Sequence, residues 1–127
     1  MSISAYKRLT IALGILCAGL LVICGCLFWR FGWQGIQIAF ASEQTEIFDE
    51  MRTKALQSDP AGAAGYLEYV VRYYPSGTKQ EAGSKLDRIV ERERAFAERD
   101  IMAYLRTKTG EDLGANPEAW IQKYATK

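Results

Sequence analysis

The pattern of hydrophobic and polar positions divides the chain into an apolar first part and an amphipathic second part. Residues 9–29 form a run of 21 residues without a charged side chain. About 20 apolar residues match the hydrocarbon core of a bilayer, whereas a soluble core helix that is apolar on every side is rare. The run therefore predicts a transmembrane helix, and aromatic residues suited to membrane interfaces flank it: Tyr6, Trp29 and Trp33.

A juxtamembrane segment at residues 30–41 is expected either to prolong the transmembrane helix or to lie at the membrane surface, and helical periodicity follows it. Apolar residues recur at a spacing of three and four in three stretches, residues 42–57, 60–74 and 78–107. We therefore expect an all-α fold, in which one N-terminal transmembrane helix precedes a small helical-hairpin domain at residues 42–127, with a long helix and a short C-terminal helix.

The longest predicted helix, residues 78–107, is about twice the length of the helix before it. Part of it is therefore expected to pack on something else, within this chain or beyond it. Arg94 and Glu98 are expected to pair on its flank. Its predicted apolar stripe consists of Ala82, Leu86, Ile89, Val90, Phe96, Ala97, Ile101, Tyr104 and Leu105.

The charges near the apolar run predict its orientation. Lys7 and Arg8 precede the run and only Arg30 closely follows it, so the positive-inside rule places residues 1–8 in the cytoplasm and the C-terminal domain outside it. "AFAS", residues 39–42, has the form of a signal-peptidase site, but the apolar run is longer than a signal peptide's. We expect an uncleaved, single-pass anchor in a bacterial inner membrane.

Composition excludes several classes of function. Sixteen basic and 15 acidic residues give a formal net charge of +1, which predicts no binding of nucleic acid. The chain contains no histidine, and its three cysteines all lie in the apolar run. Without these nucleophiles and ligands we expect no catalytic residues, no metal, no cofactor and no small-molecule substrate.

The stretch "TGEDLGANPEAW", residues 109–120, is rich in turn-forming and acidic residues. We interpret it as a boundary between helices, with Gly110 after one helix and Asn116 and Pro117 opening the next, as Asp59 and Pro60 do earlier. A calcium loop is the competing interpretation, but the required alternation of acidic ligands is missing. Its candidate ligands are Glu111, Asp112, Asn116 and Glu118.

Two resemblances accompany these patterns. Residues 104–124 are similar to a closing segment of bacterial helical-repeat proteins of the HEAT type, which implies a helical packing unit without catalytic residues. The matching positions are Thr109, Gly110, Asp112, Gly114, Pro117, Ala119 and Trp120. Residues 63–86 resemble a tetratricopeptide-like helical hairpin, a unit that usually contributes to protein-binding surfaces. One such unit implies a hairpin and not a solenoid.

Three groups of residues are candidates for interaction. Tyr69 and Tyr73 lie four residues apart beside the predicted core face, and tyrosines are enriched in interfaces. Glu93 and Asp100 interrupt the apolar stripe of the long helix, which suggests a docking position, ion pairs with Arg52 or Arg72, or an acid–base pair. Gly14 and Ala18 form a small-xxx-small pair of the kind that permits membrane helices to pack closely.

These features predict a membrane-anchored protein that takes part in protein–protein interaction or scaffolding, for instance as an accessory subunit of a membrane complex. Its expected partners are the lipid bilayer and another membrane protein or itself. The alternatives are a membrane-bound enzyme that uses Glu93 and Asp100, and an anchor that self-assembles through Gly14 and Ala18.

Overall fold

The computed structural model describes residues 3–125, and all of its regular structure is helical. The helices are α1 (Ile3–Ala55), α2 (Pro60–Arg72), α3 (Lys85–Thr109) and α4 (Pro117–Tyr124). No strand occurs among the described residues. The predicted all-α fold, with a long apolar N-terminal helix followed by shorter helices, is confirmed.

The chain forms two compact units, one ending at Ile36 and the other beginning at Gln37, and α1 contributes to both. In the first unit every described residue is exposed. Within residues 3–125, α1 is the one helix that is long and apolar enough to cross a membrane, and its apolar stretch is buried at no position. A core helix of a soluble protein would instead bury such a stretch.

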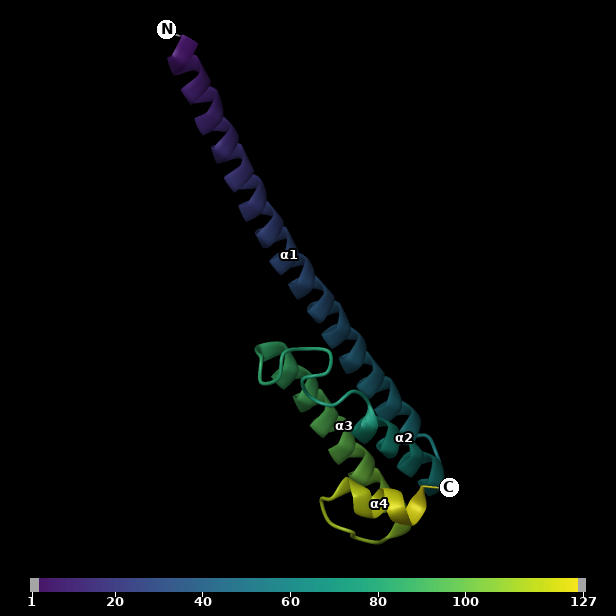
Figure 1. Ribbon diagram of the computed structural model, residues 1–127. Helices are drawn as coiled ribbons and strands as arrows, with labels where there is room; N and C mark the ends of the chain where they lie inside the picture. The colour runs from purple at the N-terminus through teal and green to yellow at the C-terminus, as the bar shows by residue number, and fades with distance from the viewer. Residues whose placement is uncertain (1–2, 126–127) are drawn as a thin grey trace. The chain divides into compact units, whose positions relative to one another are not determined.

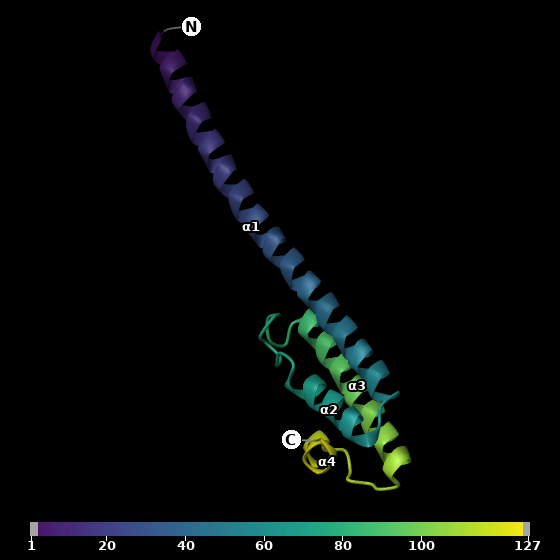
Figure 2. The same ribbon diagram turned by 90° about the vertical axis from the view of Figure 1, so that its right-hand side faces the viewer.

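The second unit is a helical bundle built from the end of α1, α2, α3 and α4. In it α3 runs in the same direction as the end of α1, and α2, which follows α1 and precedes α3 in the chain, runs in the opposite direction (Figure 1; Figure 2). The core is formed by side chains from all four helices, of which the largest fully buried ones are Trp120, Phe48, Leu67, Ile101, Leu105, Val70 and Val90.

Local sequence signals account for where the shorter helices begin and end. Asp59 caps α2, because its Oδ1 accepts a hydrogen bond of 2.9 Å from the Gly62 amide. Gly110 ends α3 in the left-handed conformation, with a φ of 71°, and Asn116 caps α4 through the Glu118 amide at 3.1 Å. The predicted boundary role of residues 109–120 is confirmed at both of its ends.

The predicted start of the long helix at residue 78 was wrong, because residues 73–84 form an irregular connection and α3 begins at Lys85. The connection is held by the carboxylate of Asp87, whose residue is only 3% exposed. It accepts hydrogen bonds from Ser76 Oγ at 2.6 Å, the Gly77 amide at 3.2 Å and the Gly83 amide at 2.9 Å. These bonds replace the helical bonds that periodicity predicted.

The predicted helix at residues 42–57 has no separate start, because the juxtamembrane segment prolongs the helix before it, which is one of the two expectations for that segment. Residues 30–41 and 42–55 are both helical and belong to α1, which ends at Ala55. No proline interrupts this part of the chain. The change from apolar to amphipathic sequence therefore marks a change of surroundings and not a break in the helix.

The apolar stripe of α3 is only partly as predicted. Val90, Ala97, Ile101 and Leu105 are buried, but Ile89 is 43% exposed and Phe96 is 44% exposed. Arg94, predicted to lie on the flank and pair with Glu98, is only 7% exposed, and its Nε lies 3.2 Å from Glu91 Oε2 instead. The buried face of α3 is therefore rotated toward Arg94.

Candidate partner-binding surface

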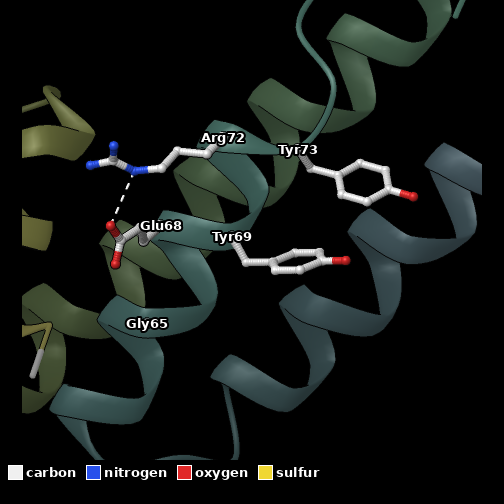
Figure 3. Close-up of a pocket in the computed structure, with 5 residues that line it drawn as sticks. All are labelled: Gly65, Glu68, Tyr69, Arg72 and Tyr73. Carbon is white, nitrogen blue, oxygen red and sulfur yellow. Dashed lines mark ion pairs between the residues drawn. The ribbon is translucent and has the colours of Figure 1, made fainter. Parts of the chain in front are cut away.

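Tyr69 lies in the last turns of α2 and Tyr73 is the residue that ends the helix, and both rings project toward α1 (Figure 3). Their rings stack with centroids 5.3 Å apart and planes inclined by 27°. Tyr69 is 46% exposed. Tyr73 is half-buried and makes edge-to-face contacts with Phe48 and Tyr74, with ring centroids 6.0 Å and 4.7 Å apart. Tyr73 thus attaches the exposed ring of Tyr69 to the core of the second unit.

A shallow open groove of about 400 Å³ lies beside the two rings, as Figure 3 shows, lined by Gly65, Glu68, Tyr69, Arg72 and Tyr73. Gly65 leaves space on the floor of the groove, since a Cβ added at this residue would meet no atom within 4 Å. Glu68 Oε1 pairs with Arg72 Nε at 3.1 Å, and Arg72 Nη2 lies 3.7 Å from Glu118 Oε2 of α4. The groove therefore offers an aromatic wall and a charged wall.

Arg94 of α3 holds the end of α2 on which this surface lies. Its guanidinium donates hydrogen bonds to the carbonyl oxygens of Val70 and, at 2.7 Å, of Tyr74, and it lies 4.7 Å from the centroid of Phe48. The Val70 carbonyl belongs to the last turn of α2, where no helical amide remains to bond it, and the Tyr74 carbonyl belongs to the connection that follows the helix. A buried cation at a helix C-terminus also suits the helix dipole.

The surroundings of Tyr73 keep its phenol protonated. Burial raises the pKa of Tyr73, and the nearby carboxylate of Glu43 and the phenols of Tyr69 and Tyr74 raise it further. A protonated phenol is a hydrogen-bond donor as well as an apolar surface. The arrangement is suited to contact with another polypeptide, since stacked rings, donors and an ion pair adjoin one groove.

The two predicted carboxylates of α3 do not lie within an apolar stripe, and that part of the prediction was wrong. Glu93 is exposed and Asp100 is half-buried. Asp100 Oδ2 accepts a hydrogen bond of 3.1 Å from Arg52 Nη1, one of the ion pairs expected for it. Among the described residues no contact joins either carboxylate to Tyr69 or Tyr73.

Gly14 and Ala18 lie one turn apart on α1 in the first unit, and both are exposed. A Cβ added at Gly14 would meet nothing within 4 Å, so this face is open to close approach. A small apolar hollow of about 260 Å³ lies further along the same unit, at Gly32, lined by Phe28, Trp29, Gly32, Trp33 and Ile36. Helix packing through Gly14 and Ala18 stays a prediction.

The acidic residues of the 109–120 stretch are engaged by neighbouring side chains. Glu111 Oε2 accepts hydrogen bonds from Lys123 Nζ, at 2.6 Å, and from the Tyr124 hydroxyl, and these bonds lower the pKa of Glu111. Asp112 Oδ1 lies 3.1 Å from Arg106 Nε. Among residues 3–125 no group of three or more histidine, cysteine, aspartate or glutamate side chains is placed to hold a metal ion.

Sequence reasoning missed Gly65 and Arg94. The spacing between Gly65 and Tyr69, four residues, places both on one face of α2 and is the signal for a gap beside the ring. Arg94 lies four residues after Val90 and seven before Ile101, which puts it in phase with the core of α3. Because Arg94 is charged, it was not counted among the core positions of the predicted apolar stripe of α3.

In comparisons with known proteins, the chain matches no family model, no curated protein and no solved structure.

Proposed function

We propose that this chain is a single-pass protein of a bacterial inner membrane whose helical second unit acts in protein–protein interaction or scaffolding, for instance as an accessory subunit of a membrane complex. One observation carries the proposal. The apolar stretch of α1 is exposed throughout, so it requires an apolar environment that the chain itself does not provide, and its length suits a bilayer.

The interaction role is supported by the Tyr69 groove. Tyr69 leaves about half of its surface uncovered, and its ring is held by Tyr73 and, through the end of α2, by Arg94. Rigid aromatic side chains with a polar tip are the residues most often found at the centre of protein interfaces. The resemblance of residues 63–86 to a tetratricopeptide-like hairpin agrees with this role.

The proposed topology has residues 1–8 in the cytoplasm, residues 9–29 in the membrane and the second unit outside the cytoplasm. Lys7 and Arg8 on one side of the apolar run and Arg30 alone on the other support it. A cysteine introduced at Gln122, an exposed position of α4, should be labelled by a membrane-impermeant maleimide in intact cells stripped of their outer membrane. Labelling only after cell lysis would refute this topology.

A catalytic role is not part of the proposal. Asp100 is paired with Arg52, and the exposed Glu93 has no neighbouring acid or nucleophile among its described contacts. The double variant Glu93→Gln/Asp100→Asn should therefore lose at most some stability. A cellular defect equal to that of a deletion, in a variant that folds normally, would favour the enzyme alternative instead.

The first experiment is photo-cross-linking in intact membranes with a photoreactive amino acid at Arg72, on the charged wall of the groove. We expect a membrane protein to be attached, and Gly65→Leu, which fills the groove, should reduce its yield. Tyr69→Ser should act similarly, whereas Leu56→Ser is the control, because Leu56 is also an exposed apolar residue, at 37%, but does not line the groove. Equal cross-linking yields from all three variants would refute the role of the groove in partner binding. Extraction of the chain from membranes by alkaline carbonate would refute the assignment of α1 as a transmembrane anchor.

A further inference from the structure

The charges of the second unit are nearly balanced but separated on its surface. All 15 acidic residues and 13 of the 16 basic residues lie after Ile36. The outward side of α1 in this unit carries acidic residues, and the outward side of α3 carries basic ones. Because the unit as a whole is nearly neutral, a charged lipid surface has little net attraction for it. An acidic face on one helix and a basic face on another are instead suited to bind a protein surface that carries the opposite charge.

The outward side of α3 repeats apolar and basic residues at fixed spacing. Ile89, Arg92, Phe96 and Arg99 follow one another at intervals of three, four and three, and all four are exposed. Neither Arg92 nor Arg99 makes a hydrogen bond or ion pair with another described residue. We call these four residues the basic face.

The outward side of α1 repeats apolar and acidic residues at the same spacing. Phe40, Glu43, Ile47 and Glu50 follow at intervals of three, four and three. The two glutamates are exposed and the two apolar residues are half-buried. Glu50 Oε1 lies 2.6 Å from Lys54 Nζ of the same helix, and Lys79 Nζ lies 4.4 Å from the centroid of the Phe40 ring. We call these four residues the acidic face.

We propose that the basic face of one copy of the chain docks on the acidic face of a second copy. When the two helices run in the same direction, four layers form at once: Phe40 with Ile89, Glu43 with Arg92, Ile47 with Phe96 and Glu50 with Arg99. Alternating intervals of three and four are those of a coiled-coil seam. In the opposite direction the intervals still agree, but every apolar residue then faces a charge.

The contact is heterologous, because two different faces of the same chain meet and each copy keeps one face free. Exposed ion pairs are individually weak, so the contact requires a high effective concentration of the two faces. Anchoring of both copies in one bilayer provides that concentration, and in this respect the proposal rests on the proposed function. The Tyr69 groove shares no residue with either face.

Cross-linking tests the geometry in the full chain reconstituted in liposomes. Cys17, Cys24 and Cys26 are replaced by alanine, and chains with Glu43→Cys are mixed with chains with Arg92→Cys before oxidation. We expect disulfide-linked dimers in the mixture and at most a tenth of that yield in either variant alone, since each lacks one of the two positions. Equal yields in the single variants, or no dimer in the mixture, would overturn the proposal.

Charge reversal tests the energetics in the same liposomes. Arg92→Glu/Arg99→Glu makes both faces acidic, and Glu43→Arg/Glu50→Arg makes both basic, so each variant alone should lose about tenfold in association measured by energy transfer between labelled chains. A mixture of the two variants should recover association, because both of its contacts join opposite charges. Association of each variant alone at the wild-type level would overturn the proposal.

A milder pair of variants controls for net charge. Arg92→Gln/Arg99→Gln should weaken association, whereas Thr78→Glu/Gln122→Glu makes the same change in net charge at exposed positions outside both faces and should leave it intact. A chain that alkaline carbonate extracts would refute the proposed function. A chain that stays in the membrane but forms no 43-to-92 cross-link would overturn this inference alone.

Discussion

Replacing Arg94 by methionine should remove much of the stability of the second unit. The variant keeps an unbranched stem beside Phe48 but loses the donors to the Val70 and Tyr74 carbonyls. A hydrogen bond to a charged group contributes about 1.5–3 kcal/mol, so two of them amount to roughly 3–6 kcal/mol. Solvent screening is slight, because Arg94 is only 7% exposed.

That loss is large beside the stability of a unit of this size. At about 0.05–0.15 kcal/mol per residue, a bundle of about 90 residues has a free energy of unfolding of roughly 5–13 kcal/mol. Arg94→Lys should be intermediate, because an ammonium retains the charge at the end of α2 but lacks the planar fork that reaches two carbonyls. Arg88→Met is the matched control, since Arg88 lies on the same helix and is exposed.

The assay is equilibrium urea unfolding of the full chain in detergent micelles. Trp29→Phe and Trp33→Phe leave Trp120, which is fully buried, as the single tryptophan reporter. We expect Arg94→Met to lower the free energy of unfolding by several kcal/mol and Arg88→Met by less than about 0.5 kcal/mol. Losses of equal size in the two variants would refute the role assigned to Arg94.

The remaining predictions concern the connections. Burial alone would raise the pKa of Asp87, but hydrogen bonds from Ser76 and two amides, together with Arg94, lower it. This stability is therefore present above the unfolded pKa of about 4 and is lost as pH falls through the folded pKa, so thermal melting below about pH 4 should be less pH-dependent in Asp87→Asn than in the wild type. Gly110→Ala should cost about 1 kcal/mol in urea unfolding, because its φ of 71° is strained for alanine. Asn116→Ala should cost about 1 kcal/mol in the same assay through loss of the α4 cap, and Gln122→Ala, exposed on α4, should change little.

The features that the sequence predicted correctly depend on residues within one helical turn of one another. Asp59 with Pro60 and Asn116 with Pro117 begin helices where expected, and Gly110 ends one. A side chain that caps a helix needs only the amides two or three residues away, so no tertiary contact is required to foresee it.

The features that were missed depend on residues far apart in the chain. Periodicity continued the long helix back to Thr78, but Asp87 bonds the connection instead, and its partners include Ser76, 11 residues away. Arg94 looked like a surface charge because its acceptors, the carbonyls of Val70 and Tyr74, are 24 and 20 residues away. Such bonds form only once α2 and α3 have packed.

The misassigned face of α3 also explains why Phe96 and Ile89 are exposed. The core covers only one side of an amphipathic helix. Because the covered side of α3 includes Arg94, Ile89 and Phe96 lie outside it. Because the carbonyls at the end of α2 require a donor, the bundle accommodates a cation in its core and leaves two apolar side chains outside. The same rotation supports the Tyr69 groove and creates the basic face, so the position of Arg94 connects the fold to both proposed surfaces.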